Sequence, residues 1–476
     1  MARPLIGLPR RRSTDRAAAA ERTGTDGSDG SGRSAAAVVA VRRLFAAETG
    51  TFWLLLGTTL FLVVLGLVMV LSSSSVEEYL ANDSFFGAFG RQATFAAIGV
   101  PAMLVASRFP VSFWKRWAVP LLLFAVVFQA LVFTPLGYEV GGNRNWIRVG
   151  GLTAQPSELV KLALAVWLGT TLALKRDVLD DWRELLRALV PAVAVSIGLV
   201  VAGGDLGTTM IMVLLVFAAV WFAGVKIRYL LVPLAVLAVA VPIVTQLSSS
   251  RTDRISAWLS GCTDEADYQA DCWQTLHGTW ALASGGLFGV GLGNSKSKWS
   301  WLPEADNDFI FAIIGEELGL VGAVVVLALF IVLAVCFVRI VRRSRDPFVR
   351  VVTGAVMAWI VGQALVNIAV VLGLLPVLGV PLPLISAGGS ALIVTLAAIG
   401  VVLSFARHAD DEGDEPEPVR APSRAAARPR PDLRPVPPAS GPAADSRAES
   451  QRRAQAAREA AARAAEARAR RVGSGR

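Results

Sequence analysis

Long apolar stretches alternate with short polar ones through the middle of this chain. A run of roughly 20 apolar residues can cross the hydrocarbon core of a bilayer as a helix, and about ten such runs occur here. They lie at residues 52–71, 93–106, 118–135, 158–174, 188–202, 208–222, 230–247, 309–338, 354–372 and 391–405. The pattern predicts an all-α integral membrane protein, because helices satisfy their own backbone groups in lipid.

The two ends of the chain are polar and low in complexity. We expect a disordered N-terminal tail at residues 1–47, a membrane domain at 48–408 and a C-terminal tail at 409–476. Residues 446–471 of the C-terminal tail are rich in Ala, Arg and Glu, which favours a partly helical, solvent-exposed segment. No apolar run follows the basic residues near the N-terminus, so a cleavable signal peptide is not predicted.

Charge sets the predicted orientation. Only 17% of the 476 residues are charged, against about 25% in a typical soluble protein. Lys and Arg recur in alternate connecting segments, as cytoplasmic loops do under the positive-inside rule, so both termini are predicted to be cytoplasmic in the inner (plasma) membrane. These cations account for the net charge of +9, and nucleic-acid binding is not expected. The outward-facing exceptions are Arg144, Arg148, Arg251, Arg254, Lys296 and Lys298.

The predicted outer segments are 72–92, 137–157, 203–207, 248–308 and 373–390. The longest, 248–308, lies between the seventh and eighth helices. Long loops are usually functional or disordered, and the Trp, Gly and Leu content of this one argues against disorder. It contains Cys262 and Cys272, between which an oxidising compartment permits a disulfide.

Three carboxylates, Glu304, Asp306 and Asp308, end this outer loop. Asp308 opens a membrane helix, where the helix dipole favours an acid, so a structural role at the helix start is one interpretation. The other is a general base, because a carboxylate withdrawn from water has a raised pKa and accepts a proton from a hydroxyl. Residue type alone leaves both open.

Further charges lie at or inside the predicted helices. Glu158 and Lys161 share one helix face near the outer side, as either a functional pair or a self-neutralising structural one. Asp205 occupies an outer turn, where it caps the next helix or has a gating role. Glu316 and Glu317 lie in an apolar run, and the candidate partners are Lys161 or an arginine of another helix.

The last outer segment is apolar but irregular. Its three prolines and its glycine pair prevent a continuous helix. Irregular backbone at membrane depth must be buried in protein or line a cavity, which suggests a groove for a lipid-linked ligand. Candidate binding residues in this segment are Ser386, Gly388, Gly389 and Ser390.

Short motifs follow one another in a distinctive order. They are Gly66-Leu-Val-Met69, Asn145-Trp-Ile147, Gln155-Pro-Ser-Glu-Leu-Val-Lys161, Asp205-Leu-Gly-Thr208, Leu302-Pro-Glu304, Asp308-Phe-Ile-Phe-Ala312, Gly315-Glu-Glu-Leu-Gly319 and Ile385-Ser-Ala-Gly-Gly-Ser390. Together they resemble the SEDS family (shape, elongation, division, sporulation) of peptidoglycan glycosyltransferases over residues 51–407. Leu302-Pro-Glu304 and Gly315-Glu-Glu-Leu-Gly319 are most similar to the cell-division members of the family, and the tails rich in Arg and Ala resemble those of actinobacterial members.

The resemblance implies polymerisation of lipid II into glycan strands at the septum, with a class B penicillin-binding protein and other divisome proteins as partners. It implies that Asp308 is the catalytic base and that Glu158 and Lys161 are the buried polar pair of the family. Asp306-Asn307 stands where the family commonly has His-Thr.

The implied leaving group is a polyprenyl pyrophosphate, which requires cations. Candidates from the sequence are Arg144, Arg148, Lys161 and Lys296, with Glu304 as a further substrate-binding residue. A divalent cation, Mg²⁺ or Mn²⁺, is a candidate cofactor, with Asp308, Asp306 and Glu304 among its oxygen ligands.

Two alternatives remain open on the sequence. A lipid II flippase would also contain charges within its membrane helices, although the acidic outer loop favours an external enzyme. A non-catalytic division scaffold would bind cytoplasmic partners through the C-terminal tail, and this role is compatible with enzymatic activity.

Overall fold

The computed structural model describes residues 50–82, 85–140, 143–149, 152–179, 181–235, 249–261, 272–299, 301–408 and 455. All of these except residue 455 belong to one unit. Most of the two predicted tails, 1–47 and 409–476, therefore lies outside the described residues, and the tail predictions stay predictions.

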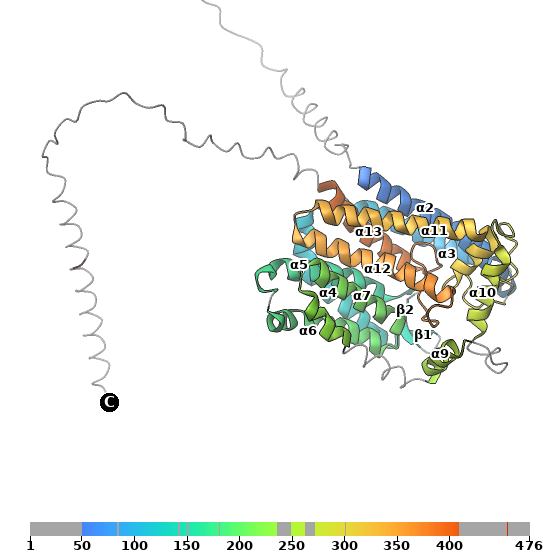
Figure 1. The fold of residues 1–476 in the computed structure, drawn as a ribbon, viewed down its shortest axis with the longest axis horizontal. Coiled ribbons are helices and arrows are strands. Elements are labelled where there is room, and N and C mark those ends of the chain that lie inside the picture. The colour runs from blue at the N-terminus through green and yellow to red at the C-terminus, as the bar shows by residue number, and fades with distance from the viewer. Residues whose placement is uncertain are drawn as a thin grey trace, which may run out of the picture. The chain divides into compact units, whose positions relative to one another are not determined.

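The described chain is mainly a bundle of α-helices that run alongside one another (Figure 1). The helices are α2 (Gly50–Asn82), α3 (Gly87–Ala106), α4 (Val111–Ala130), α5 (Pro156–Leu174), α6 (Trp182–Ala202), α7 (Leu206–Phe222), α9 (Ser249–Ser260), α10 (Trp273–Gly285), α11 (Ile310–Arg343), α12 (Pro347–Val371) and α13 (Ser390–His408). Short 3₁₀ turns at Leu131–Phe133 and Arg176–Val178 follow α4 and α5.

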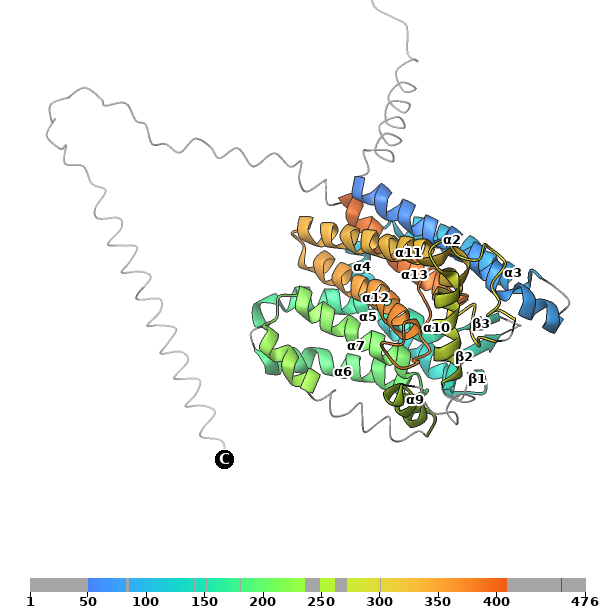
Figure 2. The ribbon, with the colours of Figure 1, turned by 45° about the vertical axis from the view of Figure 1, so that its right-hand side comes forward.

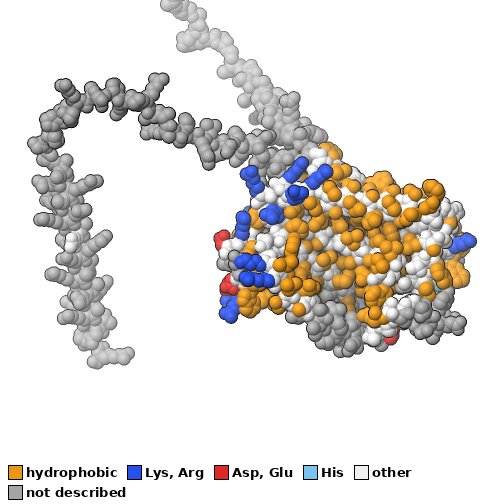
Figure 3. All heavy atoms as spheres, in the orientation of Figure 1, with side chains coloured by type: hydrophobic (Ala, Val, Ile, Leu, Met, Phe, Trp, Pro, Cys, Tyr) orange, Lys and Arg blue, Asp and Glu red, His pale blue; other side chains and the backbone are white. Residues whose placement is uncertain are grey.

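Eight of the described helices are long and apolar enough to cross a membrane, namely α2 to α6 and α11 to α13. α7 is also apolar but shorter, with 17 residues. The predicted span at 230–247 lies mostly outside the described residues, so the count of about ten stays a prediction. The face drawn in Figure 3 is largely apolar, and Lys and Arg gather toward one end, which agrees with the positive-inside rule.

The predicted helical membrane fold is confirmed, and a small antiparallel sheet is added to it. It consists of β1 (Gly137–Val140), β2 (Asn143–Val149) and β3 (Leu152–Ala154), in that order, with Ile147 paired to both Gly137 and Ala154. Strands this short give too few alternating positions to be recognised by periodicity. The sheet lies with α9 and α10 at one end of the bundle, as the views in Figures 1 and 2 agree.

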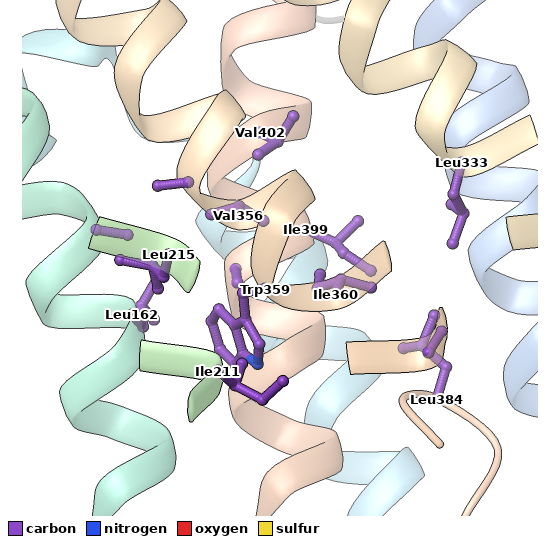
Figure 4. Close-up of a cluster of buried hydrophobic side chains, with 14 of the residues drawn as sticks. Leu162, Ile211, Leu215, Leu333, Val356, Trp359, Ile360, Leu384, Ile399 and Val402 are labelled. Atoms are coloured by element: carbon purple, nitrogen blue, oxygen red, sulfur yellow. The ribbon is translucent and has the colours of Figure 1, made fainter. Parts of the chain in front are cut away.

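The centre of the bundle is formed by α5, α12 and α13, which are the most buried of the candidate spans. Trp359 of α12 is almost fully buried. Its indole lies among aliphatic side chains such as Leu162 of α5 and Ile211 of α7 (Figure 4). This packing fixes the relative positions of α5, α7 and α12, whose outer ends frame the site described below.

α11 is broken within its length at Gly319, which has a φ of 69°. The backbone groups freed by the break are satisfied by the glycine-rich segment after α10: Val290 N donates to the Glu316 carbonyl at 3.0 Å and Leu320 N donates to the Gly286 carbonyl at 2.9 Å. A helix in lipid tolerates a break only where neighbouring groups replace the lost hydrogen bonds. The start of α11 is thereby tied to the long outer loop.

We expect Gly66→Ala to destabilise the fold. A Cβ at Gly66 of α2 would lie 2.7 Å from Ile385 Cα and 2.8 Å from its carbonyl oxygen. Forcing an atom into such a contact costs about 1–3 kcal/mol of unfolding free energy. Gly57→Ala in the same helix is the matched control, because a Cβ there meets nothing within 4 Å. Thermal unfolding in detergent measures both, and equal stability of the two variants would contradict the close packing.

Candidate functional site

A cavity of about 390 Å³ lies where four of the predicted outer segments meet. Its polar lining residues are Asn143, Asn145, Gln155, Glu158, Lys161, Asp205, Thr208, Arg254, Gln274, Glu304, Asn307, Asp308 and Gln363. Apolar residues of 376–381 line it as well. The cavity therefore combines charged groups with an apolar wall, as a site for a lipid-linked polar molecule requires.

Asp308 contributes a buried carboxylate oxygen to this cavity. Its Oδ1 makes no hydrogen bond with the described residues. Withdrawal from water, with the negative charge of Glu304, raises the pKa of Asp308 to about 7, and Asp205 and Asp306 add to the rise while Arg254 opposes it. A carboxylate that has an unpaired oxygen and titrates near neutrality is suited to accept a proton.

The backbone around Asp308 is held by α12 and by the irregular segment before α13. Asn367 of α12 donates from Nδ2 to the carbonyls of Asp308, at 2.7 Å, and Val380, at 2.8 Å. Ser386 donates from Oγ to the Asn307 carbonyl at 2.7 Å and accepts from Leu382 N at 2.8 Å. The carboxylate is thus positioned by its main chain, while its side chain stays open to the cavity.

Of the predicted serines and glycines in the last outer segment, some line the cavity and others form hydrogen bonds that hold the surrounding backbone. Gly388 lines the cavity. Ser386 supports the Asp308 segment, as described above, and Ser390 accepts a hydrogen bond from Gln155 N at 2.9 Å. A Cβ at Gly389 would meet the ring of Phe95 at 3.6 Å. The structure therefore gives Ser386 and Ser390 hydrogen-bonding partners within the protein.

The predicted pair Glu158 and Lys161 lines the cavity as one buried unit. Lys161 Nζ lies 2.9 Å from Glu158 Oε1, and the side chains of Lys161 and Glu158 are 1% and 4% exposed, respectively. The ammonium also lies 3.2 Å from Gln363 Oε1 and 4.8 Å from the ring centroid of Trp359. The charge of Lys161 is therefore largely neutralised inside the protein.

Asp205 has the capping role that the sequence suggests, and it also lines the cavity. Its Oδ1 accepts from Thr208 N at 2.8 Å at the start of α7. Its Oδ2 accepts from Gln155 Nε2 at 3.1 Å. Both carboxylate oxygens therefore have partners, in contrast to Asp308.

Glu316 and Glu317 form a separate buried cluster, and their partners are neither of the two candidates, Lys161 and an arginine of another helix. Glu317 lies 3.6 Å from Lys298 Nζ and accepts from Ser72 Oγ at 2.7 Å. Glu316 accepts from Ser295 Oγ at 2.6 Å. Because the partners come from the outer loop and α2, this cluster ties the loop to α11 just before the break in the helix.

Three predicted substrate-binding cations do not line the cavity. Arg144 donates to the Thr134 carbonyl at 2.9 Å, and the guanidinium of Arg148 lies 3.7 Å from the ring centroid of Tyr138. Lys296 is exposed. The sequence suggested these residues because they are outward-facing cations, but that property does not specify where they point.

The proposed metal ligands do not form a ready metal site. Within the described ranges, no three His, Cys, Asp or Glu side chains are grouped so that they would hold an ion. Glu304 is exposed and accepts from Asn307 Nδ2 at 3.2 Å. No reaction step is therefore assigned to a metal, and the divalent cation stays a prediction.

Cys272 is buried and disulfide-bonded. Its expected partner, Cys262, lies outside the described residues, so that pairing stays a prediction. Cys336 is a free, buried cysteine of α11.

Sequence reasoning missed several lining or supporting residues. Gln274, Gln363 and Asn367 carry ordinary amides that nothing in the sequence distinguishes. One property of Arg254 could have indicated a role: it is a cation on the predicted outer side, where the positive-inside rule predicts few cations.

Comparison with known proteins identifies the family. Residues 52–411 match the FtsW/RodA/SpoVE family model, described as cell cycle protein, and the chain belongs to this family. It is 42% identical to the probable peptidoglycan glycosyltransferase FtsW of Mycobacterium tuberculosis, over 78% of this chain and 69% of that protein. It is 36% identical to stage V sporulation protein E of Bacillus subtilis, over 76% and 98% of the two chains. The predicted SEDS resemblance is thereby confirmed.

Solved structures of related proteins support the same family assignment. A chain from a structure described as "Structural coordination of polymerization and crosslinking by a peptidoglycan synthase complex" superposes with a TM-score of 0.62 at 27% identity, covering 76% of this chain and 98% of that one. The crystal structure of Thermus thermophilus rod shape determining protein RodA gives a TM-score of 0.56 at 27% identity, covering 76% and 97%. The chain is thus an integral membrane protein of the fold that these structures share.

We expect Lys161→Met to be much less stable than the wild type, and Glu158→Gln/Lys161→Met to recover most of the loss. Removing one partner of a buried ion pair leaves an uncompensated charge and costs about 3–5 kcal/mol, whereas replacing both removes that charge. Thermal unfolding in detergent tests this. A double variant no more stable than Lys161→Met would show that the pair is not the dominant contact of either side chain.

Proposed function

We propose that this peptidoglycan glycosyltransferase polymerises lipid II into glycan strands during septal wall synthesis, with Asp308 as its general base. The observation that carries the proposal is the unpaired, buried Oδ1 of Asp308 in a cavity that also has an apolar wall. The carboxylates of Glu158 and Asp205 at this site have internal partners, and the carboxylate of Glu304 is exposed and accepts from Asn307. Asp308 therefore has the buried, unpaired oxygen that is suited to accept a proton.

The reaction that fits this site is a single displacement. The 4-hydroxyl of the lipid II sugar attacks the anomeric carbon of the growing chain, forming the new glycosidic C–O bond. The bond from that carbon to the diphosphate breaks, and the chain's former carrier leaves as a polyprenyl diphosphate. The hydroxyl proton passes to Asp308, whose raised pKa keeps it a competent base near neutrality. One base and an activated donor favour inversion at the anomeric carbon.

Other residues of the site position these groups. Asn367 and Ser386 hold the main chain of Asp308 and its neighbour. The apolar wall, which includes Val377 and Leu378, suits the first part of a polyprenyl chain entering from the membrane. The buried ion pair of Glu158 and Lys161 gives the cavity a polar surface that carries little net charge.

The partner that we propose is a class B penicillin-binding protein, which would crosslink the strands. This is supported by the similarity to a chain whose structure is described as coordinating polymerization and crosslinking in a peptidoglycan synthase complex. We further propose an inner-membrane location at the septum, cytoplasmic termini, and contacts of the tails with other division proteins.

We expect Asp308→Asn to abolish strand formation. Loss of a general base costs a factor of about 10² to 10⁴ in rate. The assay follows glycan strands formed from lipid II by the purified protein with its partner, whose transpeptidase is blocked. Asp253→Asn, which removes an exposed carboxylate of α9 outside the cavity lining, is the matched control.

The outcomes separate the alternatives. Polymer from the wild type and the control but not from folded Asp308→Asn supports the proposal. Polymer from all three would remove Asp308 from the chemistry. No polymer from the wild type, with lipid II still bound, would favour the flippase or scaffold alternatives.

The rate of polymerisation should rise with pH through about 7, the pKa of Asp308. The pKa is raised in the folded protein, so below pH 7 the carboxyl is protonated and cannot accept the hydroxyl proton, and above pH 7 it is ionised and active. Initial rates from about pH 5 to pH 9 measure this. A rate that stays constant down to about pH 4, the range of an ordinary Asp, would contradict it.

A further inference from the structure

The charges that line the cavity are unbalanced. Among the described lining residues, the acids are Glu158, Asp205, Glu304 and Asp308, and the cations are Lys161 and Arg254. Lys161 is committed to Glu158 at 2.9 Å. A lipid-linked diphosphate would therefore meet three remaining carboxylates, and like charges at close range repel. Only a cation that is not already paired can make this cavity receptive to such an anion.

Arg254 meets this requirement. It lies on α9, in the long outer loop, and is exposed to the cavity that it lines. Its guanidinium makes no hydrogen bond or ion pair with another residue in the described part of the chain. The other outward-facing arginines that were candidates, Arg144 and Arg148, contact Thr134 and Tyr138 instead.

The structure also fixes where Arg254 lies. One turn further along α9, Trp258 donates from Nε1 to the Gly373 carbonyl at 3.0 Å, which anchors the helix to the end of α12. Ile255 lines the same cavity, so this face of α9 is turned toward it. From α10, Gln274 adds an amide to the lining. The two helices therefore present a cation and a neutral donor from the outer side of the cavity.

We infer that Arg254, assisted by Gln274, forms the subsite that binds the diphosphate of the lipid-linked donor. The inference rests on the proposed function and names the group of this chain that receives the leaving group. As the bond between the anomeric carbon and the diphosphate oxygen breaks, negative charge grows on the diphosphate. A planar guanidinium donates to two phosphate oxygens at once and stabilises that charge.

The subsite links donor binding to the base. Asp308 is influenced by Glu304, Asp205 and Asp306, which favour its protonated form, and by Arg254, which favours the ionised form. Glu158 and Lys161 line the same cavity but neutralise each other. A bound diphosphate would neutralise Arg254, so Asp308 becomes a stronger base when the donor is in place.

The direct test measures binding of a polyprenyl diphosphate, with the matching polyprenyl monophosphate as the second probe, to the full chain in nanodiscs of zwitterionic lipid. We expect Arg254→Ala to bind the diphosphate about tenfold more weakly or worse, as the loss of charge-assisted hydrogen bonds predicts, and Arg254→Lys to recover part of the affinity. The loss should be smaller for the monophosphate. Arg91→Ala, which removes an exposed arginine of α3 paired with Glu78, should bind both probes as the wild type does.

Equal diphosphate affinity of wild type and Arg254→Ala would overturn the inference, as would an equal loss in Arg91→Ala, which would indicate a general effect of outer charge. Arg254→Ala could bind neither probe because it is less stable, which a lower unfolding temperature would reveal. Arg254→Lys, which keeps a long side chain and the charge, then serves as the test variant. If Arg254→Lys then binds no better than Arg254→Ala, the inference is overturned.

A second readout separates an anion-binding role from a merely structural one. In the polymerisation assay at limiting donor, where the pH profile of kcat/KM reports the free enzyme, Arg254→Ala should shift the midpoint upward, because Asp308 loses the positive charge that favours its ionised form. An unshifted midpoint would count against the subsite. Failure of the proposed function would give a different result from failure of the subsite. If the proposed function is wrong, the wild type forms no strands, but diphosphate binding still depends on Arg254. In that case Asp308→Asn also binds the diphosphate as well as the wild type does.

Discussion

Polar groups withdrawn from water must find partners, and this constraint organises the outer half of the bundle. Glu158 is paired with Lys161, Glu317 with Ser72 and Lys298, and the main chain of Asp308 with Asn367. Neutral side-chain atoms such as Asn307 Oδ1 and Asn367 Oδ1 also lack a hydrogen bond, but Asp308 Oδ1 is the one carboxylate oxygen among the buried, unpaired side-chain atoms of the described residues. An unsatisfied carboxylate costs stability, and its retention in a cavity is consistent with use in chemistry.

The close helix contacts that hold the fold together also hold the backbone around Asp308. The irregular segment before α13 is held by Gly66 of α2 on one side and by Asn367 of α12 on the other, and it in turn holds the residues around Asp308. The broken helix α11 begins at Ile310, two residues after Asp308, and its first part is tied to the outer loop through Glu316. Catalytic geometry of this kind depends on supporting residues as much as on the reacting one.

Sequence reasoning reached the features that depend on local pattern. Runs of apolar residues predicted the membrane-spanning helices that the structure describes. A spacing of three residues on one helix predicted that Glu158 and Lys161 lie side by side. It could not reach contacts between distant segments: Ser72 and Glu317 are separated by 245 residues, and nothing local indicates that they meet. For the same reason Ser386 was expected to bind substrate although it supports Asp308, and Arg254 could not be distinguished from Arg144.

The proposed role of Asp308 depends on burial, which raises the pKa of its carboxyl to about 7. Infrared difference spectroscopy of the full chain in nanodiscs, with Asp308→Asn subtracted from the wild type, isolates the protonated carboxyl of this residue during a pH titration. We expect its C=O band to disappear as the pH rises, with a midpoint at about pH 7. A band that is already lost at about pH 4, where an ordinary Asp ionises, would contradict it.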